Sequence, residues 1–317
     1  MTVVGTGMVE IGQETKILAM NILETRKRFS TKRRCIKYLE EKRWEGSPKC
    51  PYCDSTKSSS RAKEHRYQCN SCNRSYSVTV GTIFHNSNLC LTKWLLAISL
   101  ILNAKKGISS RQLSRDLGVD KNTAWYLQMR VRRAMNEHDS TLSGMVEVDE
   151  TYIGGDLQNR TKRYRLERDK AGIVPSGMEH KQPIIGMLQR GGIIIGKVLD
   201  KAHGKTIKPV LRRFIDTAST VITDGFGGYH GIHNNFKDHQ IINHTQDEYV
   251  REEFHLNTLE GFWSLLKRGI QGQYHSISKR YLQSYVNEFC FRYSYRSDPH
   301  LFDRLILRTF KLNPVKC

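Results

Sequence analysis

The sequence predicts an α/β domain built on five strands, preceded by a small metal-bound module and a group of helices. Three observations support this fold class. The stretch from Gly46 to Thr79 holds two Cys-x-x-Cys pairs and too few aliphatic residues to form a core without a metal. Apolar residues recur at helical spacing between Leu91 and Met135. After Gly144, short runs rich in Val and Ile, bounded by glycine or charged residues, indicate strands.

The composition points to a polyanionic partner. The chain has 317 residues, with 51 Lys and Arg against 31 Asp and Glu, so its formal net charge is +20. Such a chain repels itself unless a polyanion neutralises it, and nucleic acid is the expected partner. A membrane surface is the rival, but neither a basic amphipathic helix nor a lipidation signal is plain. The longest apolar run, Trp94 to Leu102, is shorter than a membrane span, so we expect a soluble, cytoplasmic, DNA-associated protein without a membrane partner.

Changes of composition divide the chain into five segments. They are an N-terminal leader and helix (1–45), the metal-bound module (46–80), three short helices (90–137), the α/β domain (143–300) and a C-terminal tail (301–317). The stretch 159–170 holds six basic residues and almost nothing apolar, so we expect it to be a surface loop.

The α/β domain should contain five strands and two helical regions. A helix is expected at Thr206 to Ile215, between the third and fourth strands, and helical patterning runs from Leu256 to about Arg296. The expected strands are Met145 to Val148, Pro183 to Leu188, Ile193 to Leu199, Thr220 to Thr223 and Gln240 to Asn243.

The paired cysteines have the spacing of a zinc ribbon. Cys50 and Cys53 form one pair, and Cys69 and Cys72 form the second after fifteen intervening residues. Two such pairs bring four thiolates around one tetrahedral zinc ion, and four thiolates leave no open position for chemistry. We therefore expect one structural Zn²⁺ in a module that contacts DNA or protein, with DNA favoured by the surrounding lysines and arginines.

Residues 108 to 126 resemble a helix-turn-helix. Gly118 would lie in the turn, and Asp120 would cap the second helix. The residues expected to reach base edges are Lys121, Asn122 and Thr123, and those expected to reach phosphates are Arg130, Arg132 and Arg133. The alternative is an ordinary helical hairpin with a solvated basic face.

Three acidic residues form a candidate catalytic site. Asp149 and Asp224 each follow an apolar run and should lie at strand ends, and Glu260 lies on a predicted helix. Two-metal phosphoryl transfer needs carboxylates on adjacent rigid elements to hold two divalent ions about 4 Å apart. Glu147 and Glu150 flank Asp149, and we expect both to point to the other side of the sheet as structural residues.

The helix that carries Glu260 should have one polar and one apolar face. Lys267 follows Glu260 by two helical turns, so both lie on the face that also holds Asn257 and Ser264. The apolar face collects Leu256, Leu259, Trp263 and Leu266. Lys267 could then hold a phosphate beside a metal ligand.

Three segments together resemble a known family. They are Val146 to Gly155, Ile222 to Tyr229 and His255 to Gly269, and the stretch Arg43 to Cys53 matches as well. The resemblance is to bacterial insertion-sequence transposases, ISXO-type, which join an N-terminal zinc ribbon to a DDE integrase domain of RNase H-like fold. It implies a mixed five-stranded sheet with flanking helices, and Asp149 and Asp224 as the first two metal ligands. Glu260 is our choice for the third catalytic residue, and Asn257 is the alternative because some branches are described with asparagine there.

The resemblance also implies a reaction and its partners. The reaction would be strand cleavage at transposon ends followed by transfer into target DNA, performed by a homo-oligomer on double-stranded DNA. Two Mg²⁺, or Mn²⁺ as substitute, suit the hard carboxylate oxygens of such a site. Two other functions stay open at this point: a DNA-binding regulator whose catalytic domain has decayed, and an RNase H-like structure-selective nuclease.

Overall fold

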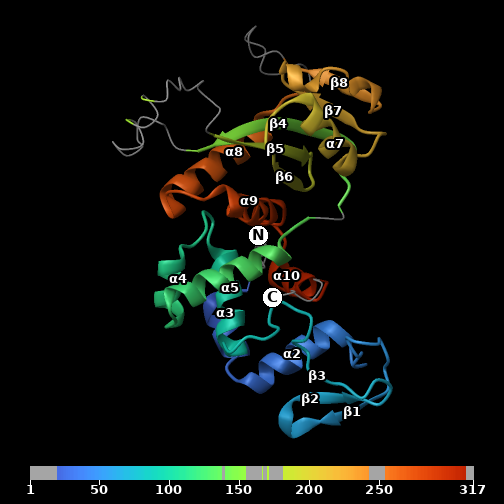
Figure 1. Cartoon of the computed structure of the whole chain (residues 1–317), viewed down its shortest axis with the longest axis vertical. Helices are drawn as coiled ribbons and strands as arrows, with labels where there is room; N and C mark the ends of the chain where they lie inside the picture. Colours follow the sequence, from blue (N-terminus) through green and yellow to red (C-terminus); the bar gives the residue numbers. More distant parts are fainter. Residues whose placement is uncertain are drawn as a thin grey trace, which may run out of the picture.

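The computed structural model describes residues 20–137, 140–154, 181–242 and 254–311, together with Leu166 and Lys170. The expected surface loop at 159–170 therefore lies almost wholly outside the described residues. The molecule is elongated, with a sheet domain at one end, the zinc ribbon at the other and a bundle of helices between them (Figure 1). Among the described residues, no helix is long and apolar enough to cross a membrane.

A mixed five-stranded sheet forms the centre of the α/β domain, as predicted. Its strands are β4 (Met145–Ile153), β5 (Gln182–Gln189), β6 (Ile194–Val198), β7 (Thr220–Thr223) and β8 (Asp238–Ile241), in the order β6-β5-β4-β7-β8. β4, β5 and β6 pair antiparallel, whereas β4 with β7 and β7 with β8 pair parallel. This topology confirms the fold class expected from the sequence.

The first strand of the sheet is longer than the sequence indicated. β4 continues past Val148 to Ile153 because its second half still pairs with β5, where Glu150 lies opposite Ile185. On its other side β4 pairs with β7 only as far as Glu147, opposite Ile222. Asp149 consequently lies in the middle of a strand and not at its end, at the point where the parallel pairing stops.

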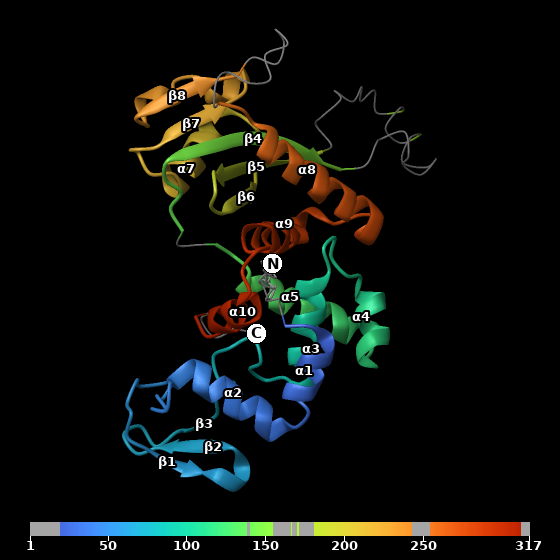
Figure 2. The same cartoon turned by 180° about the vertical axis from the view of Figure 1, so that it is seen from behind.

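Helices cover both faces of the sheet. α7 (Gly204–Phe214) packs on one face through Ile207, Leu211 and Phe214. The other face is covered by α8 (Asn257–Gly269) and α9 (Lys279–Ser294), as the two opposite views show (Figures 1 and 2). The helical region expected from 256 to 296 is therefore two helices, separated by the π-helical turn Ile270–Tyr274.

The N-terminal half forms a second core. Its helices are α1 (Ile22–Arg28), α2 (Lys32–Trp44), α3 (Leu91–Asn103), α4 (Ser110–Leu117) and α5 (Lys121–Ala134). A three-stranded antiparallel ribbon follows α2, made of β1 (Ser58–Arg61), β2 (Arg66–Cys69) and β3 (Ser75–Tyr76). The three helices expected between 90 and 137 are present, and the leader holds two described helices where one was expected.

The C-terminal segment is not a tail. Residues expected to form a tail from 301 onward instead form α10 (Leu301–Thr309), which returns to the N-terminal core. Leu301, Phe302, Leu305 and Ile306 are buried there, because the spacing of these apolar residues gives α10 one hydrophobic face. This helix therefore shares one core with the N-terminal helices.

A buried ionic cluster fastens the helical half to the sheet domain. Glu288 of α9 is fully buried, and its carboxylate contacts the guanidinium of Arg132 of α5 at 2.6 Å and that of Arg292 at 3.3 Å. These two positive charges hold the pKa of Glu288 below its usual range, although burial acts in the opposite direction. Because a buried charge is costly without its partner, this cluster constrains how α5 and α9 meet.

Candidate catalytic and metal sites

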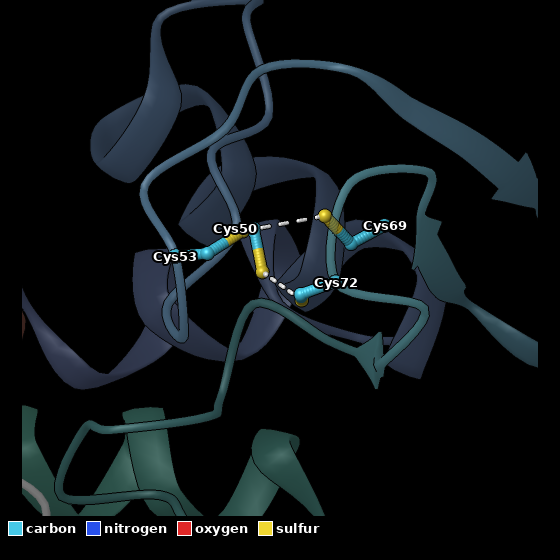
Figure 3. A group of neighbouring side chains, drawn as sticks. All are labelled: Cys50, Cys53, Cys69 and Cys72. Atoms are coloured by element: carbon cyan, nitrogen blue, oxygen red, sulfur yellow. Dashed lines mark hydrogen bonds between the residues drawn. The ribbon is translucent and has the colours of Figure 1, made fainter.

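The four cysteines of the ribbon meet in space as a metal-binding group. Cys50 and Cys72 have sulfur atoms 3.6 Å apart, as have Cys53 and Cys69, and all four sulfurs lie within 4.8 Å of one another (Figure 3). A tetrahedral zinc ion with Zn–S bonds of about 2.3 Å requires sulfurs about 3.8 Å apart, so the group fits zinc. Without a metal the thiols differ: backbone N–H groups, first that of Cys72, lower the pKa of Cys69 to about 6, whereas the pKa of Cys53 is raised to about 12 among the neighbouring thiols.

Aromatic residues pack the ribbon against the preceding helix. Tyr67 and Tyr76 face each other across β2 and β3 and stack with ring centroids 5.6 Å apart. Trp44, the last residue of α2, meets both rings edge-on at 5.4 and 5.8 Å. The three rings together pack the ribbon against the end of α2.

The two aspartates are brought together by strand register. Glu147 pairs with Ile222 across the parallel strands β4 and β7. Asp149 lies two residues after Glu147, and Asp224 lies two residues after Ile222, so the register brings the two aspartates near each other, consistent with the effect of the Asp224 charge on the pKa of Asp149. Asp224 directly follows β7, as predicted, and its Oδ1 accepts a hydrogen bond of 3.0 Å from the N–H of Phe226.

The pKa of Asp149 indicates that negative charges are clustered around it. Burial, together with the charges of Asp224 and, to a smaller extent, Glu260, raises the pKa of the Asp149 carboxyl to about 6. Glu150 belongs to the same cluster, since burial and the charges of Asp224 and Asp149 raise its pKa to about 7. A site that opposes the ionisation of its own carboxylates is one that a cation would stabilise.

Two bonds from β4 fix the helix that carries Glu260. The indole Nε1 of Trp263 donates a 2.9 Å hydrogen bond to Oδ2 of Asp149. One pleat earlier, Oε2 of the fully buried Glu147 accepts a 3.0 Å hydrogen bond from the N–H of Leu259, in the first turn of α8. Because α8 has no side-chain cap of its own, Glu147 supplies one from the sheet.

The negative charge of Glu147 is paired with a nearby arginine. Nε of Arg190 lies 3.2 Å from its Oε1, and Nδ1 of His255 lies 3.6 Å from the same oxygen. A second guanidinium nitrogen of Arg190 donates to the carbonyl oxygen of His255 at 3.1 Å. The residues just before α8 are thereby tied to the strand that holds Asp149.

Our expectation for the residues that flank Asp149 was half wrong. Glu147 lies on the same side of the sheet as Asp149, because residues two apart in a strand share a face. Glu150 does point to the opposite side, where the hydroxyl of Tyr229 donates to its Oε2. The spacing of two was visible in the sequence, but nothing in the sequence showed that Trp263 would reach across to Asp149.

The polar face predicted for α8 is present. Asn257, Glu260, Ser264 and Lys267 are all exposed, whereas Leu259, Trp263 and Leu266 are buried on the other side. In the described part of the chain, the four cysteines are nevertheless the only group of three or more ligand atoms within 4.8 Å of one another. Glu260 is therefore near enough to influence Asp149 electrostatically without forming a closed cage with it.

The helices expected to read DNA expose only some of the predicted residues. α4 and α5 are joined by a turn at Gly118, whose φ is +57°, and Asp120 caps α5 by accepting from the N–H of Asn122 at 2.7 Å. The exposed residues of the predicted set are Lys121, Asn122, Thr123 and Arg133.

Two arginines of that set are buried and bonded to other groups of the protein, which corrects the expectation that they reach phosphates. Arg132 is 1% exposed because it pairs with Glu288, and Arg130 is 6% exposed and donates to the carbonyl oxygen of His85 at 2.6 Å. Both lie on the face of α5 that packs inward, which helical spacing alone did not distinguish from the face of Arg133.

Comparison with known proteins agrees with this architecture. Residues 30–75 match the transposase zinc-ribbon domain, and residues 141–294 match the ISXO2-like transposase domain. The order of the two matches, zinc ribbon first and transposase domain second, agrees with the order of the ribbon and the sheet domain in the structure. An uncharacterized protein in transposable element ISH50 of Halobacterium salinarum is 29% identical over 278 residues, which cover 84% of this chain and 92% of that protein. The chain is therefore similar to insertion-sequence transposases that carry a zinc ribbon and an ISXO2-like domain.

Proposed function

We propose that this protein catalyses divalent-metal-dependent cleavage of DNA at transposon ends and transfer of the cut strands into target DNA. The observation that carries the proposal is the strand register that brings Asp149 near Asp224, together with the hydrogen bond from Trp263 that ties α8 to Asp149. The match to the ISXO2-like transposase domain supports the same reaction class.

The residues present suit a hard divalent cation. Asp149, Asp224 and Glu260 offer carboxylate oxygens, the ligands that Mg²⁺ and Mn²⁺ prefer. Burial, and after it the negative charges of Asp224 and Glu260, raise the pKa of Asp149. When bound, two such ions would activate the attacking oxygen and stabilise the leaving one. The hydrogen bond from Trp263 holds Oδ2 of Asp149, and Oδ1 accepts a 2.8 Å hydrogen bond from the N–H of Glu150, so the carboxylate is fixed in orientation.

The exposed face of α8 completes the proposed site. Lys267 lies seven residues after Glu260, about 10 Å along the helix, where it would hold a phosphate of the bound strand. Asn257 is exposed one turn before Glu260 and stays the alternative third residue. The influence of Glu260 on the pKa of Asp149 favours Glu260.

The DNA would be bound by the N-terminal half. We assign base contacts to Lys121, Asn122 and Thr123 at the exposed start of α5, and a phosphate contact to Arg133. We expect the active form to be a homo-oligomer that acts in the cytoplasm, because transfer requires transposon ends and target DNA to be held together.

A strand-transfer assay tests the proposal. The substrate is a labelled duplex that carries the DNA ends flanking the gene, with Mg²⁺ as the added metal. Asp224→Asn should abolish joined products, whereas Asp216→Asn should retain them, because Asp216 precedes the same strand β7 at the opposite end. Glu260→Gln and Asn257→Ala, compared in parallel, identify the third residue by which one loses the joining activity.

The outcomes separate the alternatives. DNA binding without cleavage in Mg²⁺ or Mn²⁺ would contradict the proposal and favour a decayed regulator. Cleavage without joined products would favour a structure-selective nuclease.

A further inference from the structure

A dense run of basic residues covers the corner where α1 meets α2. Between residues 26 and 37 the chain has seven lysines and arginines and no acidic residue. All seven are exposed: Arg26, Lys27, Arg28, Lys32, Arg33, Arg34 and Lys37. We infer that this basic corner is a contact surface for the phosphate backbone of duplex DNA, separate from the start of α5.

The basic corner is held in place by buried residues. Phe29, between the two helices, is 3% exposed and packs against the rings of Tyr38 and Phe302 at 4.8 and 5.8 Å. Thr31 caps α2 by accepting from the N–H of Arg34 at 3.3 Å. The backbone beneath the charges is therefore fixed, so binding a ligand there would not have to order a flexible segment.

The charges of the corner form no salt bridge in the described residues, although Arg28 is near enough to Asp303 to help lower the pKa of that carboxyl. None of the seven forms a salt bridge with a carboxylate there, in contrast with Arg132 and Arg190, which each pair with a buried glutamate. Arg34 donates to the carbonyl oxygen of Lys27 at 3.2 Å and to the hydroxyl of Ser30 at 2.8 Å, which organises the surface without neutralising it. Concentrated positive charge of this kind attracts a polyanion.

The position of the corner in the fold favours DNA as that polyanion. The hydroxyl of Thr25, on α1, donates to that of Ser99, on α3, at 3.1 Å. α3 in turn packs against α4 and α5, so the corner and the exposed start of α5 are carried by helices that share one hydrophobic core (Figure 2). The apolar residues inside the run, Phe29, Cys35 and Ile36, are buried, so only charge is offered. Charged side chains alone position a duplex without reading its bases.

The identification of the polyanion as DNA rests on the proposed function, but the test does not depend on catalysis. Binding of the full chain to a labelled random-sequence duplex is measured without Mg²⁺ at several salt concentrations. Each phosphate contact contributes about 0.9 to the slope of log K against log[salt]. The variant Lys32→Gln/Arg33→Gln/Lys37→Gln should therefore lose about 2.7 from the slope, so that the native protein loses about 40-fold more affinity than the variant between 50 and 200 mM salt.

A matched triple variant supplies the control. Lys201→Gln/Lys205→Gln/Arg212→Gln removes the same charge from exposed positions on and beside α7, in the sheet domain. It should leave the slope nearly unchanged. A second variant, Arg26→Gln/Lys27→Gln on α1, should lose about 1.8 from the slope, which covers the case in which the first variant folds poorly. Zinc content and the thermal unfolding midpoint report folding of each variant.

Several outcomes would overturn the inference. Equal losses in the corner variant and the α7 variant would show that only the overall charge matters. An unchanged slope in both corner variants would refute the assignment of the corner as a DNA contact surface. So would corner variants that bind DNA normally but no longer bind anionic phospholipid vesicles. If the corner variants lose the predicted part of the slope but the native protein joins no DNA ends, the proposed catalytic function is refuted and the DNA contact at the corner is still supported.

Discussion

Substitution of Glu147 by Gln removes the charge that links β4 to α8. Glu147 is fully buried; one of its carboxylate oxygens lies 3.2 Å from Nε of Arg190, and the other accepts from the N–H of Leu259 at 3.0 Å. The Gln side chain keeps the shape and one acceptor oxygen. It leaves the guanidinium of Arg190 beside an uncharged group.

The size of the effect follows from how deeply the pair is buried. Removal of one partner of a buried ion pair costs about 3–5 kcal/mol. Arg190 is 23% exposed and can be partly hydrated, so we expect the lower end of that range, about 3 kcal/mol of unfolding free energy. The matched control is Glu64→Gln, which breaks a 4.0 Å pair with Arg61 in which both side chains are at least half exposed, and it should cost less than about 1 kcal/mol.

Urea unfolding, followed by circular dichroism and tryptophan fluorescence, measures both variants. Because Glu147 holds the first turn of the helix that carries Glu260, the strand-transfer rate of the folded variant should also fall. A loss of stability below about 1 kcal/mol, or one equal to that of Glu64→Gln, would refute the claim that this ion pair holds the helix.

Three further predictions follow from the two sites. Cys53→Ser should release the zinc and make residues 46–80 sensitive to protease, whereas Cys90→Ser should do neither; zinc analysis and limited proteolysis measure this. The pKa of Asp149 is raised to about 6 in the folded chain from 3.8, so without metal its contribution to stability is lost as pH rises between these values. Asp149→Asn should therefore stabilise the metal-free protein by up to about 3 kcal/mol at pH 8 and not at pH 3. Urea unfolding at both pH values measures this. An equal change in stability at the two pH values would show that the pKa of the carboxyl is not raised. Gly186→Ala should destabilise the sheet by about 1–3 kcal/mol, because the added Cβ would lie 2.5 Å from the indole of α8, whereas Gly261→Ala on the same helix meets no atom within 4 Å and should not; thermal unfolding compares the two.

The local patterns of the sequence determined the zinc ribbon almost completely. Four cysteines at fixed short spacings can come together in few arrangements, and zinc stabilises only the tetrahedral one. Cys50, Cys53, Cys69 and Cys72 could therefore be assigned as ligands without knowledge of the fold. The same holds for the polar face of α8, because helical periodicity places Glu260 and Lys267 on one side whatever the helix packs against.

Features that depend on packing could not be read from local patterns. β4 ends where its pairing with β5 ends, and this partner is distant in sequence, so Asp149 was expected at a strand end. Arg132 and Arg133 are adjacent in a basic stretch, and only the arrival of Glu288 from α9 makes one buried and leaves the other exposed.

The features that the sequence predicted and those that only the structure showed differ in the sequence distance between the residues that determine them. Periodicity and residue spacing report which face of an element is apolar and which side chains share it, because both are set within a few residues. The bond from Trp263 to Asp149 and the return of α10 to the N-terminal core join segments more than a hundred residues apart. Such contacts depend on how whole elements pack, so the tertiary structure alone decided them.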